Sequence, residues 1–113
     1  MADKILTPQR VTDVGLTPTR VSGLLVADTH IVRNDGKVLL LFLKTAAVNC
    51  VVTVQTPVKV GGLDVAERTF TVVATTGDVA ASLFPPSIYN DAVGDLRFTL
   101  SDVDGLTVAV LQL

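Results

Sequence analysis

Few residues of this chain could take part in catalysis. His30 is the only histidine and Cys50 the only cysteine among the 113 residues. Nucleophilic catalysis would have to pair His30 with Cys50 or with a serine, and a hydrolase serine would stand in a Gly-x-Ser-x-Gly turn. None of the four serines has these neighbours: Ser22, Ser82, Ser87 and Ser101. We therefore expect that the chain is not an enzyme.

Metal ligands are equally scarce. A zinc site needs three or four Cys or His ligands, and the chain has two such residues in total. Asp28-Thr29-His30 is predicted to be an exposed turn before a strand. Cys50 stands in the run Asn-Cys-Val-Val-Thr-Val, which predicts a small buried residue of a strand, and a single cysteine excludes an internal disulfide. We expect neither a metal nor a cofactor.

Two short motifs resemble ligand loops but lack the other parts of such loops. Asp102-Val103-Asp104-Gly105 is not followed by the closing Glu of a calcium loop, so it predicts a hairpin turn. Gly61-Gly62 is not followed by the Gly-Lys-Ser/Thr of a phosphate loop, and it also predicts a turn. Glu67 and Arg68 precede a strand, where they predict a surface ion pair or a turn rather than a catalytic carboxylate pair.

Composition indicates one soluble domain that has partners. The net charge is −2, and the basic residues are scattered, so the chain lacks the basic stripe that nucleic-acid binding requires. The longest apolar run, residues 38–43, is much shorter than a membrane-spanning helix. Hydrophobic residues make up 49% and charged residues 18% of the chain. Such a composition favours apolar surface that is covered by partner subunits, with no small-molecule substrate.

The pattern along the chain is strand, turn, strand. Valine occurs twenty times and threonine fourteen times, which favours pleated, half-buried strands. Turn signals such as Asn34-Asp35-Gly36 separate the apolar runs. The sequence predicts an all-β domain over residues 23–113, an antiparallel β-sandwich or jelly roll of about seven or eight strands. The candidate strands are residues 23–27, 37–44, 50–56, 69–74, 80–84, 96–100 and 106–111.

Residues 1–22 predict an extended N-terminal arm. Two near-repeats, LTPQRVTDVG (6–15) and LTPTRVSGLL (16–25), each carry Leu-Thr-Pro-x-Arg-Val at the same offsets. Thr-Pro favours extended backbone, and neither copy has helical periodicity. The arm either folds onto its own domain as an edge strand or crosses to a neighbouring subunit. Its candidate interface residues are Thr7, Pro8, Gln9, Arg10, Val11, Thr17, Pro18 and Arg20.

A second candidate interface is the segment FPPSIYND at residues 84–91. It contains two of the five prolines and the only tyrosine. Pro85 and Pro86 restrict the backbone and remove two donors, so the segment is predicted to be a shaped loop. A stiff apolar loop without chemical groups beside it favours a role in contact. The candidate interface residues here are Phe84, Pro85, Pro86, Ile88 and Tyr89.

Five stretches together give the chain a family likeness. They are residues 62–72 (GLDVAERTFTV), 84–91 (FPPSIYND), 7–10 (TPQR), 15–19 (GLTPT) and 106–111 (LTVAVL). In this order the chain resembles the small virion proteins of tailed bacteriophages and related prophages, of the capsid-decoration or minor-capsid type. The likeness covers nearly the whole chain, and its motifs are structural rather than chemical.

The resemblance implies a β-sandwich that attaches to an assembled capsid and stabilises it. The implied partners are the major capsid protein and further copies of the chain, with a homotrimer as the expected oligomer. The implied location is the surface of the virion, after synthesis in the host cytoplasm. Two alternatives stay open at this point. One is a head–tail joining or tail component, and the other is a carbohydrate-binding or adhesin module on the virion surface.

Overall fold

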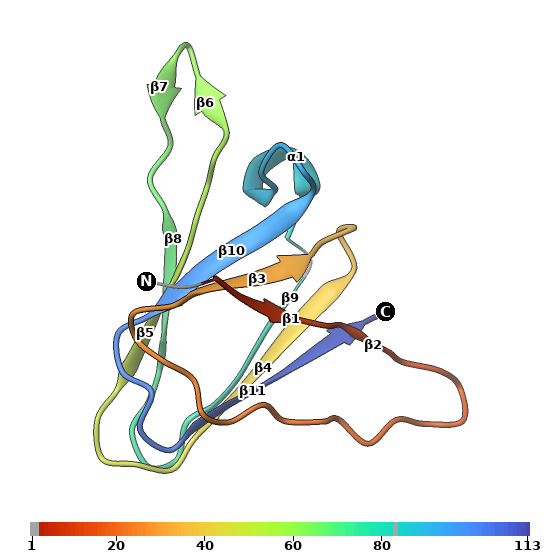
Figure 1. Cartoon of the computed structure of the whole chain (residues 1–113), viewed down its shortest axis with the longest axis vertical. Helices are drawn as coiled ribbons and strands as arrows, with labels where there is room; N and C mark the ends of the chain where they lie inside the picture. Colours follow the sequence, from red (N-terminus) through yellow and green to blue (C-terminus); the bar gives the residue numbers. More distant parts are fainter. Residues whose placement is uncertain (1–2, 83) are drawn as a thin grey trace.

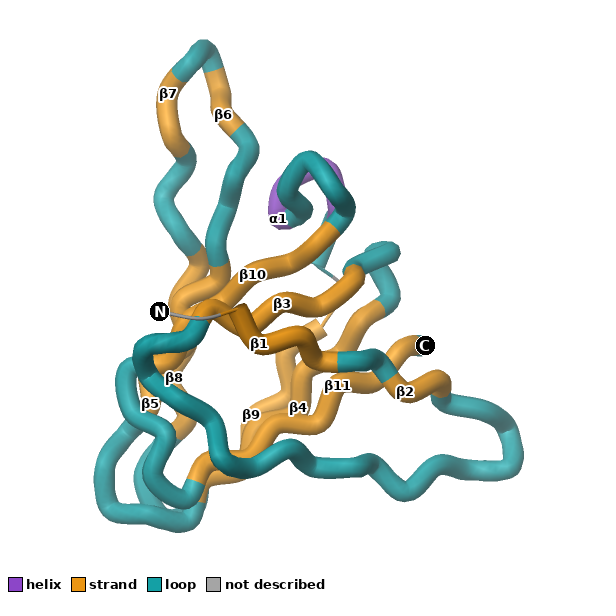
Figure 2. The backbone as a smooth tube through the Cα atoms, in the orientation of Figure 1, coloured by secondary structure: helices purple, strands orange, loops and turns teal. Residues whose placement is uncertain are grey.

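The computed structural model describes residues 3–82 and 84–113. Their regular secondary structure consists of eleven strands and one short helix, joined by turns and loops (Figures 1 and 2). The all-β prediction is therefore confirmed. The elements are β1 (Asp3–Leu6), β2 (Gln9–Arg10), β3 (Thr29–Arg33), β4 (Val38–Lys44), β5 (Cys50–Val54), β6 (Lys59–Val60), β7 (Leu63–Asp64), β8 (Arg68–Val72), β9 (Asp78–Ser82), α1 (Pro86–Tyr89), β10 (Asp95–Leu100) and β11 (Leu106–Gln112).

The strands form two larger sheets and one hairpin. Sheet A has the order β1-β3-β10-β5-β8, sheet B has the order β2-β11-β4-β9, and β6 pairs with β7. Among the described residues, the strand pairs within 23–113 are antiparallel, whereas β1 runs parallel to β3 and β2 runs parallel to β11, so it is the N-terminal segment that makes both sheets mixed. The described strands number eleven, more than the eight expected at most. The additional ones include short pairs at the N-terminus and at the β6–β7 hairpin, where too few residues alternate to reveal a strand.

Most connections carry the chain from one sheet to the other. β3, β5, β8 and β10 belong to sheet A, whereas β4, β9 and β11 belong to sheet B. Asn34-Asp35-Gly36 and Asp104-Gly105 therefore join strands of different sheets, so the prediction of a hairpin turn at Asp102-Val103-Asp104-Gly105 is wrong. An Asp-Gly pair favours a tight turn, but it does not determine which strands pair on either side. Gly61-Gly62 does close the β6–β7 hairpin, and both glycines have positive φ values, of 60° and 78°.

One hydrophobic cluster lies between sheets A and B. Phe42 of β4 meets Phe98 of β10 edge to face, with ring centroids 5.9 Å apart, and meets Phe70 of β8 at 5.8 Å. Cys50 is buried in the same cluster, as predicted. The apolar run at residues 38–43 would leave both faces of a strand apolar, which predicts a central strand, and β4 does lie between β11 and β9. Its side chains alternate between fully buried and half-buried positions along the whole strand.

The first predicted strand of the domain lies in the wrong place. Residues 23–27 form no strand, and Gly23 has a φ of 69° that L-residues rarely adopt. Leu24 is buried in the core, whereas Leu25 and Val26 are exposed. The strand begins further along the chain, as β3. His30 lies within β3, so the prediction of an exposed turn there is wrong. The His30 ring has no exposed surface and stacks on Phe98, with ring centroids 5.1 Å apart.

Sheets A and B are also joined by a buried ammonium group at the end of β4. The side chain of Lys44 has no exposed surface. Its Nζ donates to Asp102 Oδ1 at 2.9 Å and to the Asp104 carbonyl oxygen at 2.6 Å. Lys44 thereby lowers the pKa of Asp102 below the usual carboxyl value. The carboxylate of Asp102, in the loop between β10 and β11, therefore neutralises the buried lysine.

This pair predicts that Asp102→Asn lowers the urea midpoint of unfolding, because it leaves the buried ammonium group of Lys44 without its countercharge. Asp64→Asn is the matched control, since Asp64 pairs with the exposed Lys59 and exposed pairs contribute little. Equal midpoints for the two variants would contradict this account of Lys44.

His30 predicts a pH dependence of stability near neutrality. Burial lowers the pKa of His30 below 6.5, with a smaller lowering by Lys4 and an opposing effect of Asp28. Since the unfolded chain then binds the proton more readily, stability should fall as the pH drops below about 6.5, by at most about 1.4 kcal/mol per pH unit. Urea unfolding of the wild type should show this loss between pH 7.5 and 5.5, and His30→Leu should remove it.

Four carboxyl groups have pKa values that hydrogen bonds lower below the usual Asp value, which moves their titration away from this pH range. These groups are Asp35, Asp64, Asp91 and Asp102. A loss of stability in His30→Leu as large as that of the wild type over the same range would show that another group is responsible.

Candidate interaction surfaces

A groove lies beside α1, between an edge strand of sheet A and an edge strand of sheet B. We call it the α1 groove. β8 is the last strand of sheet A and β9 the last strand of sheet B. The groove between these two edges and α1 has a volume of about 480 Å³, a size typical of binding pockets. It is lined by Arg68, Phe70, Ala81, Phe84, Pro85, Ile88 and Tyr89.

Residues 84–91, which we call the α1 loop, contain five predicted interface residues. These residues divide into a buried inner set and an exposed outer set. Phe84 and Tyr89 are buried, at 6% and 8% exposure, and their rings meet edge to face at 5.4 Å. Pro85, Pro86 and Ile88 are exposed. Proline at the first helical position needs no donor, and the carbonyl of Pro85 accepts bonds from the N–H groups of Ile88 and Tyr89. This single turn points the two rings inward and leaves the aliphatic groups outside.

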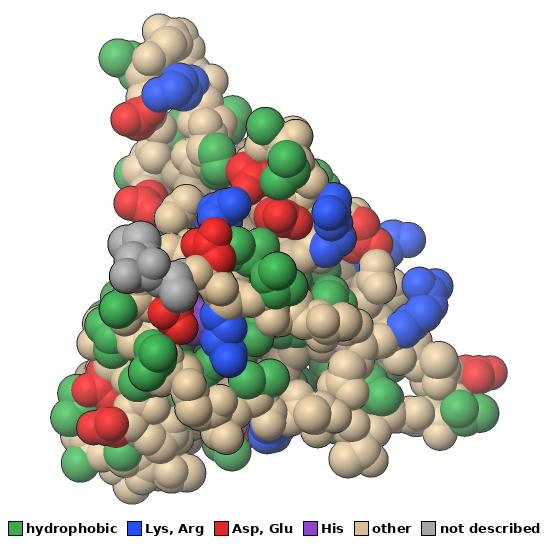
Figure 3. Space-filling model, in the orientation of Figure 1, with side chains coloured by type: hydrophobic (Ala, Val, Ile, Leu, Met, Phe, Trp, Pro, Cys, Tyr) green, Lys and Arg blue, Asp and Glu red, His purple; other side chains and the backbone are tan. Residues whose placement is uncertain are grey.

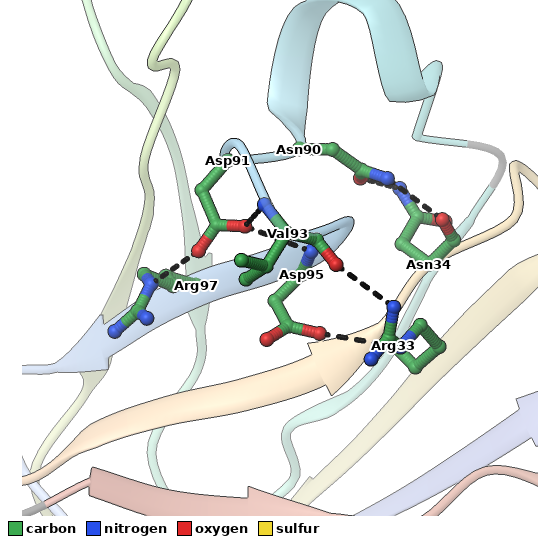
Figure 4. A network of polar contacts seen from close by, with 7 residues as sticks. All are labelled: Arg33, Asn34, Asn90, Asp91, Val93, Asp95 and Arg97. Carbon is green, nitrogen blue, oxygen red and sulfur yellow. Dashed lines mark hydrogen bonds and ion pairs between the residues drawn. The ribbon is translucent and has the colours of Figure 1, made fainter.

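Two asparagines, which the sequence interpretation did not select, hold the ends of the α1 loop together (Figure 4). The Asn34 side chain, which is buried, donates to the Phe84 carbonyl at 2.9 Å and to Asn90 Oδ1 at 2.7 Å. Asn90 donates back to the Asn34 carbonyl at 2.7 Å. Both residues stood out in the sequence only as turn formers. Their side chains connect β3 to the loop, so the loop has a defined position on sheet A.

Charged groups fix the segment that follows (Figure 4). Asp91 accepts bonds from the backbone N–H groups of Val93 and Asp95 and from Arg97 Nε, the last at 2.8 Å. The bond from Arg97 lowers the pKa of Asp91. Arg33 donates to the Val93 carbonyl at 2.8 Å and lies 3.5 Å from Asp95. These contacts and those of the two asparagines therefore hold residues 84–95 in a defined position before any partner arrives.

The N-terminal segment occupies the opposite edges of the same two sheets. β1 is the first strand of sheet A and β2 the first strand of sheet B. Residues 3–10 thus form edge strands on their own domain, the first of the two alternatives for the arm. Thr7 and Gln9 line a second groove, of about 400 Å³, while Pro8 borders a smaller cavity next to Arg33.

Both sequence repeats form backbone hydrogen bonds with the same strand, β11. Val11 and Val21 occupy equivalent repeat positions, and both donate to the edge of β11 that faces away from β4. The Val11 N–H reaches the Gln112 carbonyl at 2.9 Å, and the Val21 N–H reaches the Val108 carbonyl at 2.7 Å. Residues 12–20 leave the sheets between these two points as a loop that projects from the domain (Figure 2). Thr17, Pro18 and Arg20 belong to this loop, and Arg10 precedes it as the last residue of β2.

The outer side of sheet B forms a third surface, which we call the leucine face. Leu39, Leu41 and Leu43 of β4 point away from the core and are half-buried. In the strand register Leu39 pairs with Leu111, and Leu41 pairs with Ala109 on one side and Ala80 on the other. Residues that pair in this way share one face of a sheet. The face therefore has an apolar centre, as the two-sided apolar run of the sequence predicts.

Comparison of the chain with family models, with curated proteins and with solved structures finds no match. Within residues 3–82 and 84–113, no group of three or more His, Cys, Asp or Glu side chains could hold a metal ion. The helix of this described part is too short to cross a membrane. We therefore infer the function from three surfaces: the α1 groove, the N-terminal segment and the leucine face.

The inner and outer sets of the α1 loop predict different effects of truncation. Phe84→Ala should destabilise the fold by about 3–5 kcal/mol, because it leaves a cavity beside Tyr89. Ile88→Ala should change stability by less than about 1 kcal/mol, because Ile88 is 38% exposed. Urea unfolding of both variants provides the comparison, and a destabilisation by Ile88→Ala that equals that of Phe84→Ala would contradict the division.

Proposed function

We propose that the chain is a non-enzymatic structural protein of a bacteriophage virion, which decorates the capsid and stabilises it through its N-terminal segment and loops. One observation carries this proposal. Residues 62–72 and 84–91, the two longest stretches of the family likeness, meet in the α1 groove. Arg68 Nε lies 3.4 Å from the Tyr89 hydroxyl, and both side chains line the groove.

The proposed architecture is a β-sandwich made of sheets A and B. Its support is the single hydrophobic cluster that contains side chains of both sheets, with Phe42 of sheet B against Phe98 of sheet A. The repeated crossing of the chain between the sheets is typical of sandwich topologies. Such a domain exposes its edges and one face of each sheet, which suits a protein that is bound on more than one side.

The surfaces fit a role in repeated weak contacts. The leucine face has an apolar centre with Thr107 and Asp78 at its border, an arrangement that is common in protein interfaces. The α1 groove and the N-terminal segment offer two further contact regions on other parts of the domain. On a symmetric shell, many modest contacts add up through effective concentration. The proposed partners are the major capsid protein and other copies of this chain.

Two neighbouring functions differ from this proposal in ways that can be measured. A head–tail joining or tail component would have the same kinds of surface but far fewer copies in each particle. A carbohydrate-binding module would use an exposed aromatic ring to stack on a sugar. Tyr89 is the only tyrosine and the chain has no tryptophan, and the Tyr89 ring is buried against Phe84. This arrangement argues against stacking of a sugar.

Particles purified from a culture of the strain that encodes the chain should contain it in numbers comparable to those of the major shell protein. Quantitative mass spectrometry of gradient-purified particles measures the ratio, and the soluble fraction of the same lysate serves as the control. A much smaller ratio would support the head–tail alternative. Particles without the chain would contradict the proposed function.

A further inference from the structure

We propose that the α1 groove of one copy receives the projecting loop, residues 12–20, of a second copy, so that copies associate head to tail. This inference rests on the proposed function only in that it identifies a contact between the copies that the proposal includes. Four features of the described residues carry the inference. They are the shape of the loop, the open edges beside the groove, the charges on both sides, and the positions of the two surfaces.

The loop is held in a projecting shape within its own chain. The Gln9 side chain donates to Thr19 Oγ1 at 3.0 Å and accepts from the Thr19 N–H at 2.7 Å, which closes the neck of the loop. At the other end Gly15 turns the backbone with a φ of 89° and donates to the Thr12 carbonyl. A loop that is ordered before binding loses less conformational entropy when it binds.

The tip of this loop presents an apolar side chain next to an acid. Val14 is 89% exposed, the largest exposure among the large hydrophobic side chains of the described residues. Asp13 precedes it and is also exposed. In Figure 3 a hydrophobic and an acidic side chain lie together at the far end of the loop. An apolar pocket would remove this side chain from water, which favours its burial at a contact.

The α1 groove has an apolar wall and a basic side chain, which complement the valine and the acid at the tip of the loop. Phe84, Pro85 and Ile88 supply an apolar wall, and the volume of about 480 Å³ exceeds that of one valine side chain. Arg68 stands on the same groove. Its Nε–H is directed at Tyr89, which leaves the terminal nitrogens of the guanidinium for a carboxylate such as that of Asp13. β8 and β9 also have free edges in the described part of the chain, where an extended segment could add backbone hydrogen bonds.

The charges of the two surfaces are complementary at two points. The loop carries the exposed Asp13 and the exposed Arg20, and the groove region carries Arg68 and Glu67, both exposed. Asp13 would meet Arg68, and Arg20 would be available to Glu67. Opposite charges of this kind fix the orientation of two partners and disfavour other arrangements.

The positions of the two surfaces determine the type of assembly. The loop leaves from the β2 and β11 edge of sheet B, whereas the groove lies at the β8 and β9 edges. Two different patches of one chain then form each contact, so the contact is heterologous. Heterologous contacts close into a ring when the rotation between the copies allows it, and a ring of defined size is the expected product.

The direct test is the oligomeric state of the full chain by size-exclusion chromatography with light scattering. The wild type should form an oligomer of defined mass, and Asp13→Arg or Arg68→Asp alone should weaken association at least about tenfold. The double variant Asp13→Arg with Arg68→Asp should restore association. Lys37→Asp reverses an exposed charge outside both surfaces and should behave like the wild type.

A crosslink locates the contact independently. In a Cys50→Ser background, Val14→Cys with Ile88→Cys should form disulfides between copies, whereas Val14→Cys with Val60→Cys, in the β6–β7 hairpin outside the groove lining, should not. A monomeric wild type at all concentrations, or single charge variants that associate like the wild type, would overturn the inference. The particle composition described above is measured separately, so the two proposals can fail independently.

Discussion

The packing of sheet A against sheet B through three phenylalanine rings is the interaction on which the rest of the structure depends. Phe42 contacts both Phe70 and Phe98, so it joins β4 to an edge strand and to a central strand of the other sheet. Because the chain crosses repeatedly between the sheets, its connections gather at the ends and edges of this core. The α1 groove, the projecting loop and the leucine face all obtain their positions from it.

The connection between β9 and β10 shows how such a position becomes fixed. Phe84 and Tyr89 insert into the core, while Asn34 and Asp91 bind the backbone on either side of them. Burial of the two rings and the hydrogen bonds beside them thus act on the same segment. Each restricts the conformations that the segment can adopt. The exposed remainder, Pro85 with Ile88, is presented on a stiff support. A contact surface of this kind requires little further ordering when a partner binds.

The sequence predicted those parts of the fold that depend on local pattern. The two-sided apolar run of β4, the buried Cys50 and the turn at Gly61-Gly62 follow from side-chain period and turn chemistry. The burial of His30 did not follow, because it depends on stacking with Phe98, which lies far along the chain. In the same way, the partners of each strand and the meeting of Arg68 with Tyr89 are properties of the tertiary fold alone.

We propose, as the central claim, that this domain acts by contact on the outside of a phage shell. Electron cryo-microscopy of purified particles tests the claim most directly. It should reveal additional density on the capsid surface that fits the 113-residue domain, with neighbouring copies in contact. Density for the domain at the head–tail junction alone, or a bare capsid surface in particles that contain the chain, would contradict it.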